Sequence, residues 1–191
     1  KAGDHVVSSK TLFGSCRVFI EDILPKFGVT STLVNGYDNE AWKEAMQPNT
    51  SVVFLESPAN PTLDIVDIKY VCDVAHENGA LVVVDNVFAT PLLQKPIEYG
   101  ADVVMYSSTK HIDGQGRCLG GCILTSNKIM DEIISPYIRH TGPNLSPFNA
   151  WVMLKSMETM DLRIDRMCLN AAKVADGLYD LGVFESVNYP F

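Results

Sequence analysis

The sequence predicts an α/β fold in which helices cover both faces of a mostly parallel sheet, a three-layer α/β/α arrangement. Three apolar runs, at residues 52–55, 81–84 and 103–106, are continuous rather than alternating, as strands buried on both faces are. The residues between these runs have helical spacing, which gives the βαβαβ order of parallel strands joined by helical crossovers. Polar residues follow each run, at the edge where open α/β sheets bind their ligands, so we expect Asn60, Asp85 and Lys110 to share one crevice.

The elements before and within this unit can be placed in order along the chain. We expect a strand at residues 4–8, a turn at 10–15, a helix at 19–27, a strand at 32–34 and a short helix at 40–46. Helical spacing over residues 65–76 predicts the first crossover helix, which Gly79 would terminate. Thr90 and Pro91 open a shorter helical stretch, and Gly100 precedes the next strand.

The segment after residue 110 predicts one more strand and three helices. We expect the strand at 120–125, in a different part of the sheet, and helices at 128–138 and 146–160. Ser146 suits the N-cap of the second of these, and Pro147 its first helical position. A third, amphipathic helix would end at Gly182 and bury one apolar stripe. The stripe consists of Ile164, Met167, Cys168, Ala171, Val174, Ala175, Leu178 and Leu181.

Composition limits the class of protein. A net charge of −8 with scattered basic residues argues against a nucleic-acid or membrane-surface partner. No apolar run has the length of a membrane span, and no signal peptide is recognised. Five cysteines without a C-x-x-C pair are typical of reduced thiols, so we expect a cytoplasmic protein. We expect no metal site, because Cys118 and Cys122 lack further ligands at zinc spacing.

Residues at successive strand ends point to a cofactor. Lys110 lies in the turn after residues 103–106 with hydroxyls at Ser107 and Thr109, and Asp85 ends the preceding run. A lysine can form a Schiff base, hydroxyls can hold a phosphate and a carboxylate can face a pyridinium nitrogen, which are the requirements of pyridoxal phosphate. Taken singly, such a lysine turn is usually a solvated loop and such an aspartate a helix N-cap. Their combined placement favours a cofactor site.

Other motifs carry less weight. Residues 114–120 are glycine-rich, but a strand follows them where a dinucleotide-binding loop requires a helix. The chain contains no P-loop, no G-x-S-x-G nucleophile elbow and no H-E-x-x-H motif. His111 could act as a base, but a histidine in this position more often packs or hydrogen-bonds, and we do not assign it a catalytic role.

Three segments resemble successive signatures of one enzyme family. They are residues 56–62 (Glu-Ser-Pro-Ala-Asn-Pro-Thr), 84–91 (Val-Asp-Asn-Val-Phe-Ala-Thr-Pro) and 106–111 (Tyr-Ser-Ser-Thr-Lys-His). Together they are similar to the Cys/Met-metabolism, or transsulfuration, pyridoxal-phosphate enzymes, which implies a large domain of the aspartate-aminotransferase-like type (fold type I). Residues 111–121 and 140–151 are most similar to the O-succinylhomoserine sulfhydrylase branch. Cystathionine γ-synthases and lyases usually have a glycine-histidine pair in place of Gly114-Gln115.

The resemblance implies a role for each candidate residue. Lys110 would form the Schiff base with pyridoxal 5'-phosphate, and Asp85 would face the pyridine nitrogen. Ser107 and Thr109 would bind the phosphate, and Asn60 would lie near the phenolic oxygen of the cofactor.

At residues 11–14, Thr-Leu-Phe-Gly, the family usually has a tyrosine that stacks on the ring. Phe13 would keep the stacking and lose any proton transfer by the phenol.

The resemblance also implies a reaction and an assembly. The reaction would be γ-replacement on O-succinylhomoserine, or O-acetylhomoserine, with sulfide, giving homocysteine for methionine synthesis. Cystathionine γ-synthase or lyase activity is the alternative within the family, and a non-catalytic chain that serves only in assembly is the alternative outside it. Asp85 and Lys110 together favour catalysis, since a scaffold needs neither. The partners would be an amino-acid substrate and further copies of the chain, in a homotetramer of dimers with shared active sites.

The resemblance to this family also implies a domain organisation. Residues 1–182 would form the cofactor-binding large domain and residues 183–191 the start of a C-terminal small domain. We expect the large domain to be incomplete at both ends, because Lys1 is not an initiator methionine and family members continue beyond the last residue.

Overall fold

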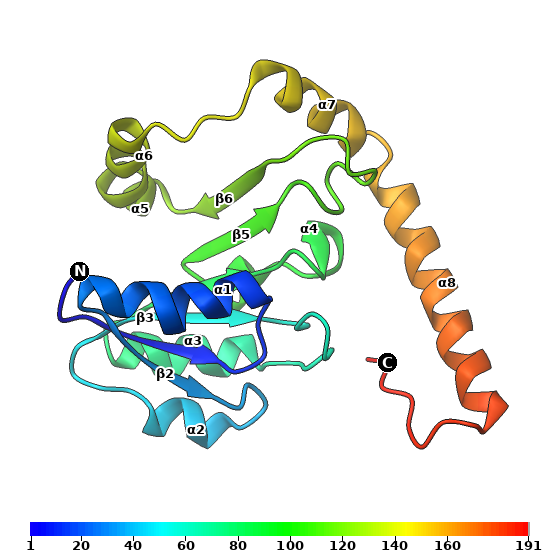
Figure 1. Cartoon of the computed structure of the whole chain (residues 1–191), viewed down its shortest axis with the longest axis horizontal. Coiled ribbons are helices and arrows are strands. Elements are labelled where there is room, and N and C mark those ends of the chain that lie inside the picture. The colour runs from blue at the N-terminus through cyan, green and yellow to red at the C-terminus, as the bar shows by residue number, and fades with distance from the viewer. Residues whose placement is uncertain (191) are drawn as a thin grey trace. The chain divides into compact units, whose positions relative to one another are not determined.

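The computed structural model describes residues 1–190, in which six strands form one sheet with the order β2-β1-β3-β4-β5-β6 (Figure 1). The strands are β1 (His5–Ser9), β2 (Thr30–Val34), β3 (Thr50–Glu56), β4 (Leu81–Asp85), β5 (Val103–Ser107) and β6 (Gly121–Thr125). The pairs β1–β2, β1–β3, β3–β4 and β4–β5 are all parallel. The mostly parallel sheet is therefore as predicted.

Two compact units make up the chain. The first contains Lys1–Tyr106 and Cys122–Asn144, and so holds nearly all of the sheet. The second contains Ser107–Gly121 and the chain from Leu145 onward.

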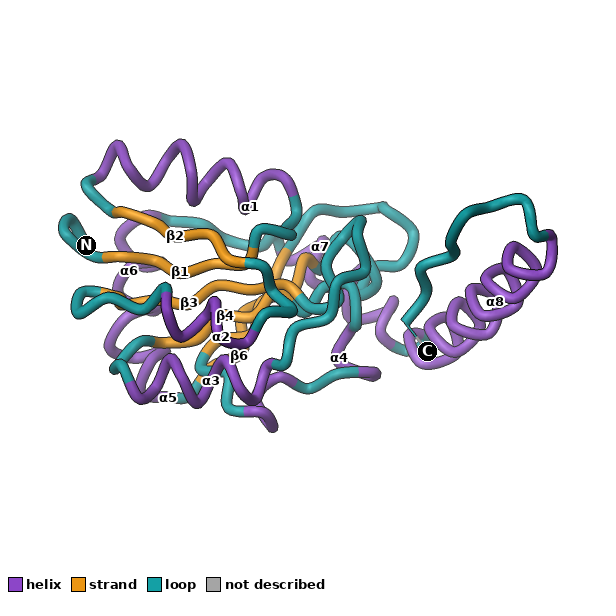
Figure 2. The backbone as a smooth tube through the Cα atoms, turned by 90° about the horizontal axis from the view of Figure 1, so that it is seen from below, coloured by secondary structure: helices purple, strands orange, loops and turns teal. Residues whose placement is uncertain are grey.

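In the first unit, helices lie on both faces of the sheet. They are α1 (Gly14–Val18, continued by Phe19–Ile23 and Leu24–Phe27), α2 (Asn39–Glu44), α3 (Ile68–Glu77), α4 (Thr90–Leu93), Pro96–Tyr99, α5 (Asn127–Ile129, continued by Met130–Ile134) and α6 (Ser135–Thr141). Figure 2 shows α1 on one side of the strands and α2 and α3 on the other. The strand residues Val53, Val82 and Val104 are at most 1% exposed, so the central strands are covered on both faces and the three-layer prediction is confirmed.

Helix α3 shows how local signals set the bounds of an element. The carboxylate of Asp67 caps it by accepting a hydrogen bond from the backbone N–H of Tyr70 at 3.0 Å. Gly79 follows the last turn with a φ of +75°, the left-handed conformation that glycine adopts without strain. The helix begins at Ile68, three residues later than the periodicity suggested, because Ile65 precedes the cap and stays exposed.

Strand β6 does not lie where the sequence analysis placed it. It neighbours β5 at the edge of the sheet, and Figure 1 shows it running in the opposite direction. The intervening loop folds back on itself, where the backbone N–H of Thr109 donates to the carbonyl of Gly120 at 3.3 Å. This return makes β6 the antiparallel partner of the strand that leads to Lys110.

In the second unit, α7 (Pro147–Met157) is followed by α8 (Met160–Leu181). The hydroxyl of Ser146 accepts a hydrogen bond from the N–H of Asn149 at 3.1 Å, so the predicted cap of α7 is confirmed. Gly182 ends α8 with a φ of +62°.

The expectation that the stripe on α8 is buried is wrong for most of its length. Ile164 and Ala175 are buried, but Met167, Val174 and Leu181 are 46%, 59% and 63% exposed. The periodicity identifies the apolar face, whereas its burial requires surfaces that residues 1–190 do not supply. Within the same residues, no helix is both long enough and apolar enough to cross a membrane.

Candidate functional site

Asp85 is a buried carboxylate at the carboxyl end of β4. It is 6% exposed, and its Oδ1 accepts one hydrogen bond from the N–H of Val87 at 3.0 Å. No Lys, Arg or His of the described chain forms an ion pair with it. Burial raises the pKa of Asp85, and the hydrogen bond from Val87 offsets part of this shift. Among residues 1–190, Asp85 is therefore a buried acid without a paired cation.

Glu56 lies beside Asp85 and organises two other predicted residues. The two acids are register partners in the adjacent strands β3 and β4, and Glu56 is 3% exposed. Its Oε2 accepts the backbone N–H of Phe13 at 2.6 Å, and its Oε1 accepts that of Asn60 at 3.1 Å. One carboxylate thus joins the turn before α1 to the turn after β3.

Burial raises the pKa of Glu56, the two backbone hydrogen bonds lower it, and the charge of Asp85 raises it. The sequence analysis did not select Glu56, although it ends its apolar run as Asp85 does. The signal that identified Asp85, a carboxylate directly after a continuous apolar run, is also present at Glu56.

The first unit presents Phe13 and Asn60 in accessible positions. Phe13 is 46% exposed at the N-cap of α1, and Asn60 is exposed in the turn after β3. Their backbone groups meet at Glu56, and Glu56 stands next to Asp85. The structure therefore brings together three of the predicted cofactor-binding residues of this unit, with a planar apolar ring, an amide and a carboxylate.

Asn86 ties together the ends of the three central strands. This fully buried side chain donates to the carbonyl of Gln94 at 2.8 Å and to the hydroxyl of Tyr106 at 2.9 Å. Gln94 in turn donates to the carbonyl of Ser57 at 2.7 Å. The network fixes the chain on either side of Asp85, including Thr90, whose φ of +62° is rare for a residue other than glycine. Its partners are mostly backbone groups, which side-chain patterns do not reveal.

Lys110 lies in the second unit, in the turn that follows β5. Its backbone N–H donates to the carbonyl of Ser107 at 3.1 Å, and its own carbonyl accepts from the N–H of Gly114 at 2.7 Å. The side chain is exposed, and within residues 1–190 its amine forms no hydrogen bond or ion pair. The backbone is held while the amine stays available for covalent chemistry.

The two predicted phosphate ligands differ in their surroundings. Ser107 is the last residue of β5 and is half-buried. The Thr109 hydroxyl accepts the N–H of Gly120 at 3.1 Å and donates to the carbonyl of Gly120 at 3.3 Å. Thr109 must therefore turn its proton away from Gly120 before it can donate to a phosphate. The predicted crevice shared by Asn60, Asp85 and Lys110 stays a prediction, since Lys110 belongs to the other unit.

The side chains fit pyridoxal phosphate chemically. The most specific observation is Asp85, because a buried carboxylate with no cation gains from a pyridinium brought to it. At about 4 Å and an effective dielectric of about 20, such a pair is worth roughly 4 kcal/mol. The remaining groups supply an amine for covalent attachment, hydroxyls for a phosphate and an aromatic ring for stacking.

Comparisons with known proteins agree with this chemistry. The profile of the family described as Cys/Met metabolism PLP-dependent enzyme matches residues 1–191. O-succinylhomoserine sulfhydrylase of Mycobacterium tuberculosis (strain CDC 1551 / Oshkosh) is 47% identical over 190 residues, which cover 100% of this chain and 47% of that protein. L-methionine gamma-lyase of Porphyromonas gingivalis (strain ATCC BAA-308 / W83) is 40% identical over 192 residues, covering 100% of this chain and 48% of that protein.

A solved structure gives the same result. Cystathionine gamma-lyase from Lactobacillus plantarum, complexed with L-serine, superposes with a TM-score of 0.91 at 32% identity, covering 99% of this chain and 49% of that one. The chain therefore spans about half the length of the curated relatives and of the solved structure it matches.

Proposed function

Because the chain belongs to the Cys/Met metabolism PLP-dependent enzyme family, we propose that it forms the cofactor-binding part of an O-succinylhomoserine sulfhydrylase. The proposed reaction joins sulfide to the γ carbon of O-succinylhomoserine, or of O-acetylhomoserine, and gives homocysteine. The observation that carries this choice is the 47% identity, over the whole chain, to a protein named as such a sulfhydrylase. The Gly114-Gln115 pair, where cystathionine enzymes usually have glycine-histidine, supports it.

This proposal gives each site residue a role at the cofactor. Lys110 holds the cofactor covalently, and Asp85 faces the pyridine nitrogen as its counter-charge. Ser107 and Thr109 donate hydrogen bonds to the phosphate, each worth about 1.5 to 3 kcal/mol to a charged acceptor.

Phe13 would stack on the ring of the cofactor, and Asn60 would lie near its phenolic oxygen. Glu56 keeps Phe13 and Asn60 in place through the two backbone hydrogen bonds that it accepts.

The proposed reaction requires proton movement rather than oxidation. Bound pyridoxal phosphate supplies an electron sink that makes protons on the substrate α and β carbons acidic. Lys110, once the substrate amine has replaced it, moves these protons. The γ C–O bond would then break with release of succinate or acetate, and hydrosulfide would form the new C–S bond at the γ carbon. Lys110 would return the protons to the β and α carbons.

A second activity has specific support. L-methionine gamma-lyase of P. gingivalis is 40% identical to this chain, and a cystathionine gamma-lyase has the same fold. Lyases of this family would use the same cofactor residues and release a keto acid instead of adding sulfide. The decision between the two activities rests on the substrate pocket.

The two activities can be separated by parallel assays of the full-length protein. We expect homocysteine from O-succinylhomoserine and sulfide, with little keto acid from cystathionine or methionine. Preferred keto-acid formation would overturn the sulfhydrylase assignment and leave the cofactor assignment intact. Failure of every reaction in a cofactor-loaded protein would favour the non-catalytic alternative.

The covalent role of Lys110 has a direct test. Borohydride reduction of the cofactor-loaded protein, followed by peptide mass mapping, is expected to place the pyridoxyl group on Lys110. A label on Lys10 or Lys95 instead would contradict the assignment.

We further propose a cytoplasmic homotetramer of dimers with shared active sites. Sedimentation of the full-length protein would test the number of subunits.

A further inference from the structure

Two arginine side chains hydrogen-bond the segment that follows Lys110. We propose that one of them, Arg163, is a positioning residue for Lys110. In this role Arg163 fixes the backbone that follows Lys110 and so the direction from which the amine enters the site. The inference rests on the proposed function, because it assumes that Lys110 carries the cofactor. All the residues that support it lie in the second unit.

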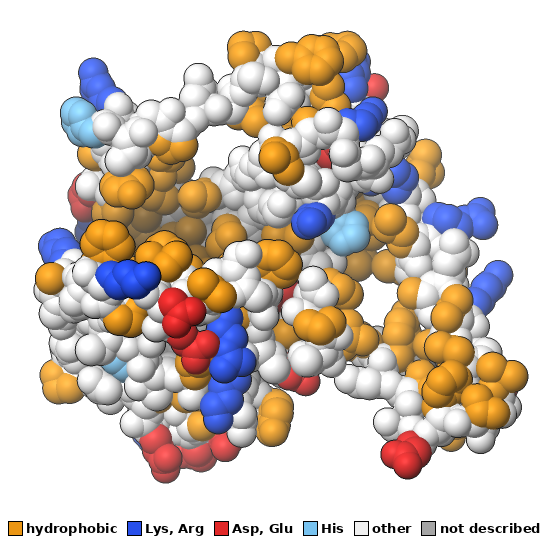
Figure 3. All heavy atoms as spheres, in the orientation of Figure 1, with side chains coloured by type: hydrophobic (Ala, Val, Ile, Leu, Met, Phe, Trp, Pro, Cys, Tyr) orange, Lys and Arg blue, Asp and Glu red, His pale blue; other side chains and the backbone are white. Residues whose placement is uncertain are grey.

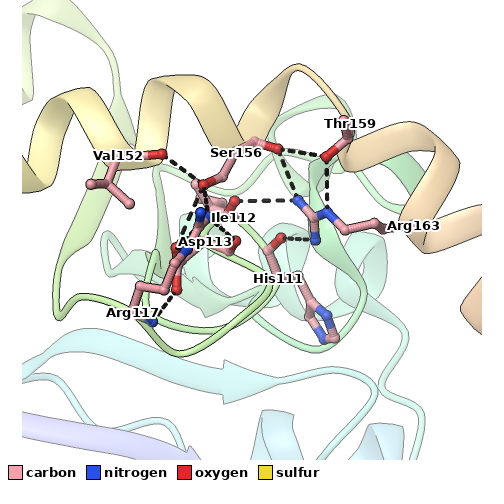
Figure 4. A network of polar contacts seen from close by, with 8 residues as sticks. All are labelled: His111, Ile112, Asp113, Arg117, Val152, Ser156, Thr159 and Arg163. Carbon is pink, nitrogen blue, oxygen red and sulfur yellow. Dashed lines mark hydrogen bonds and ion pairs between the residues drawn. The ribbon is translucent and has the colours of Figure 1, made fainter.

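Figure 4 shows the guanidinium of Arg163, on the first turn of α8, pointing into the turn after Lys110. Its Nη1 donates to the carbonyl of His111 at 2.9 Å, and its Nη2 lies 3.4 Å from that of Ile112. Nη2 also donates to the carbonyl of Ser156 at 3.0 Å, and Nε to the hydroxyl of Thr159 at 3.3 Å. One rigid group thus joins the two residues after Lys110 to the junction of α7 and α8.

A second arginine holds the far end of the same turn. Asp113 is 0% exposed at its side chain and pairs with Arg117 at 3.0 Å. The carboxylate of Asp113 also accepts the backbone N–H of Arg117 at 2.6 Å. Arg117 donates in addition to the hydroxyl of Ser156, which donates to the carbonyl of Val152 at 2.6 Å. Both arginines therefore anchor the turn to the same point of α7.

Gly114 leaves the space in which the guanidinium of Arg163 lies. A Cβ at this position would lie 2.0 Å from Nη1 of Arg163 and 2.4 Å from its Cζ. Gly114 also has a φ of +74°, and its N–H closes the turn on the carbonyl of Lys110 at 2.7 Å. Only glycine lets the guanidinium lie against the backbone here.

The chemistry of the contact explains why an arginine is suited to this place. Arg163 forms no ion pair within the described chain, and its partners are three backbone carbonyls and one hydroxyl. A planar guanidinium can reach several carbonyls in fixed directions, whereas the single ammonium of a lysine cannot span them. The role of Arg163 therefore depends on the fixed directions of its N–H groups, which another positively charged side chain does not supply.

The first test uses hydrogen exchange in the full-length protein without cofactor. In Arg163→Gln, the amide of Gly114, which donates to Lys110, is expected to exchange about tenfold faster or more, the factor given by loss of roughly one charge-assisted hydrogen bond. Arg166→Gln, the same change at an exposed position of α8, is the matched control and is expected to leave this amide unchanged. Unchanged exchange in Arg163→Gln would overturn the inference.

The second test follows attachment of pyridoxal phosphate to Lys110, trapped with borohydride at successive times. We expect attachment to slow at least about fivefold in Arg163→Gln and to stay slow in Arg163→Lys, since the ammonium cannot bridge the carbonyls. Full recovery in Arg163→Lys would overturn the bridging role. Absence of label from Lys110 in the unsubstituted protein would instead contradict the proposed function, while the exchange result would still stand.

If Arg163→Gln does not fold, a milder variant keeps the inference testable. Thr159→Val removes one of the four acceptors of Arg163 and leaves the others. We expect a two- to threefold acceleration of exchange at Gly114, as a weak hydrogen bond gives. Exchange at Gly114 equal to that of the unsubstituted protein would count against the inference.

Discussion

At the scale of single residues, Asp85 is the clearest sign that this chain is built to bind something. A carboxylate that is 6% exposed and has one backbone hydrogen bond is unfavourable in its charged form. Burial raises the pKa of Asp85 accordingly. A protein selected only for stability has no reason to place an acid there, so the cost is expected to be recovered when a cation binds.

Replacing Asp85 with asparagine is therefore predicted to stabilise the cofactor-free protein at neutral pH and to weaken cofactor binding. Because the folded pKa is raised, the native state binds the proton more tightly than the unfolded state does. The unsubstituted protein thus loses stability as pH rises from 3.8, the ordinary pKa of an aspartate, through the raised pKa of Asp85 in the folded state, and the variant does not. Thermal unfolding at several pH values is the measurement.

The gain from Asp85→Asn should be largest above the folded pKa and vanish below the unfolded one. Asp22→Asn, the same change at an exposed position, serves as the control and is expected to have no such pH dependence. A destabilised Asp85→Asn protein at neutral pH would contradict the prediction. Loss of cofactor affinity is measured separately, by titration of pyridoxal phosphate.

Glu56 is predicted to matter because it accepts two backbone hydrogen bonds at once. In Glu56→Gln only one oxygen remains, so either Phe13 or Asn60 loses its acceptor. An unsatisfied buried donor costs about 1 to 3 kcal/mol, and we expect denaturant unfolding to show a loss of this size. Cofactor affinity should fall as well, since both turns loosen. Glu44→Gln, at an exposed position, is the control; equal stability of the two variants would contradict the role of Glu56.

At the scale of elements, α3 depends on its cap as well as on its buried face. Asp67→Ala removes the acceptor of the Tyr70 N–H and is predicted to lower the free energy of unfolding by about 1 kcal/mol. Asp67→Ser keeps an acceptor oxygen and should recover most of this loss, measured by urea unfolding. If serine and alanine destabilise equally, the contribution of Asp67 lies elsewhere than in the cap.

At the scale of the whole molecule, many apolar side chains are exposed on α7 and α8. Figure 3 shows them gathered over both helices. Trp151, Leu162, Leu169 and Tyr179 are 57%, 68%, 61% and 77% exposed. Large apolar side chains exposed in such number promote association of a protein in water.

Residues 1–191 produced alone are therefore predicted to bind a hydrophobic dye and to associate as concentration rises. Dye fluorescence and sedimentation are the measurements. The double variant Leu169→Gln, Val174→Gln, with both changes at exposed positions of α8, should reduce both signals at an unchanged unfolding midpoint. A monodisperse, dye-free monomer at high concentration would contradict the prediction.

Local patterns along the chain are enough to predict the fold class and the polar residues at the strand ends. Continuous apolar runs, helical spacing and terminating glycines are local signals, because they arise from periodicity and backbone conformation within a few residues. They identified the parallel strands around Asp85 and the turn with Lys110. The caps of α3 and α7 follow the same local chemistry, although the sequence analysis recognised only Ser146.

The groups that support those residues, and the surfaces that are buried, depend on contacts between segments far apart in the sequence. Glu56 meets Phe13 across 43 residues, and Arg163 meets His111 across 52. Five of the six groups that these two side chains hydrogen-bond are backbone groups, which have the same chemistry at every position and leave no mark on the sequence. Likewise, β6 lies beside β5 because the loop at Thr109 and Gly120 folds back, and the stripe of α8 stays exposed because burial depends on a second surface. A pattern along the chain identifies the apolar face of an element, and contacts between elements determine whether that face is buried.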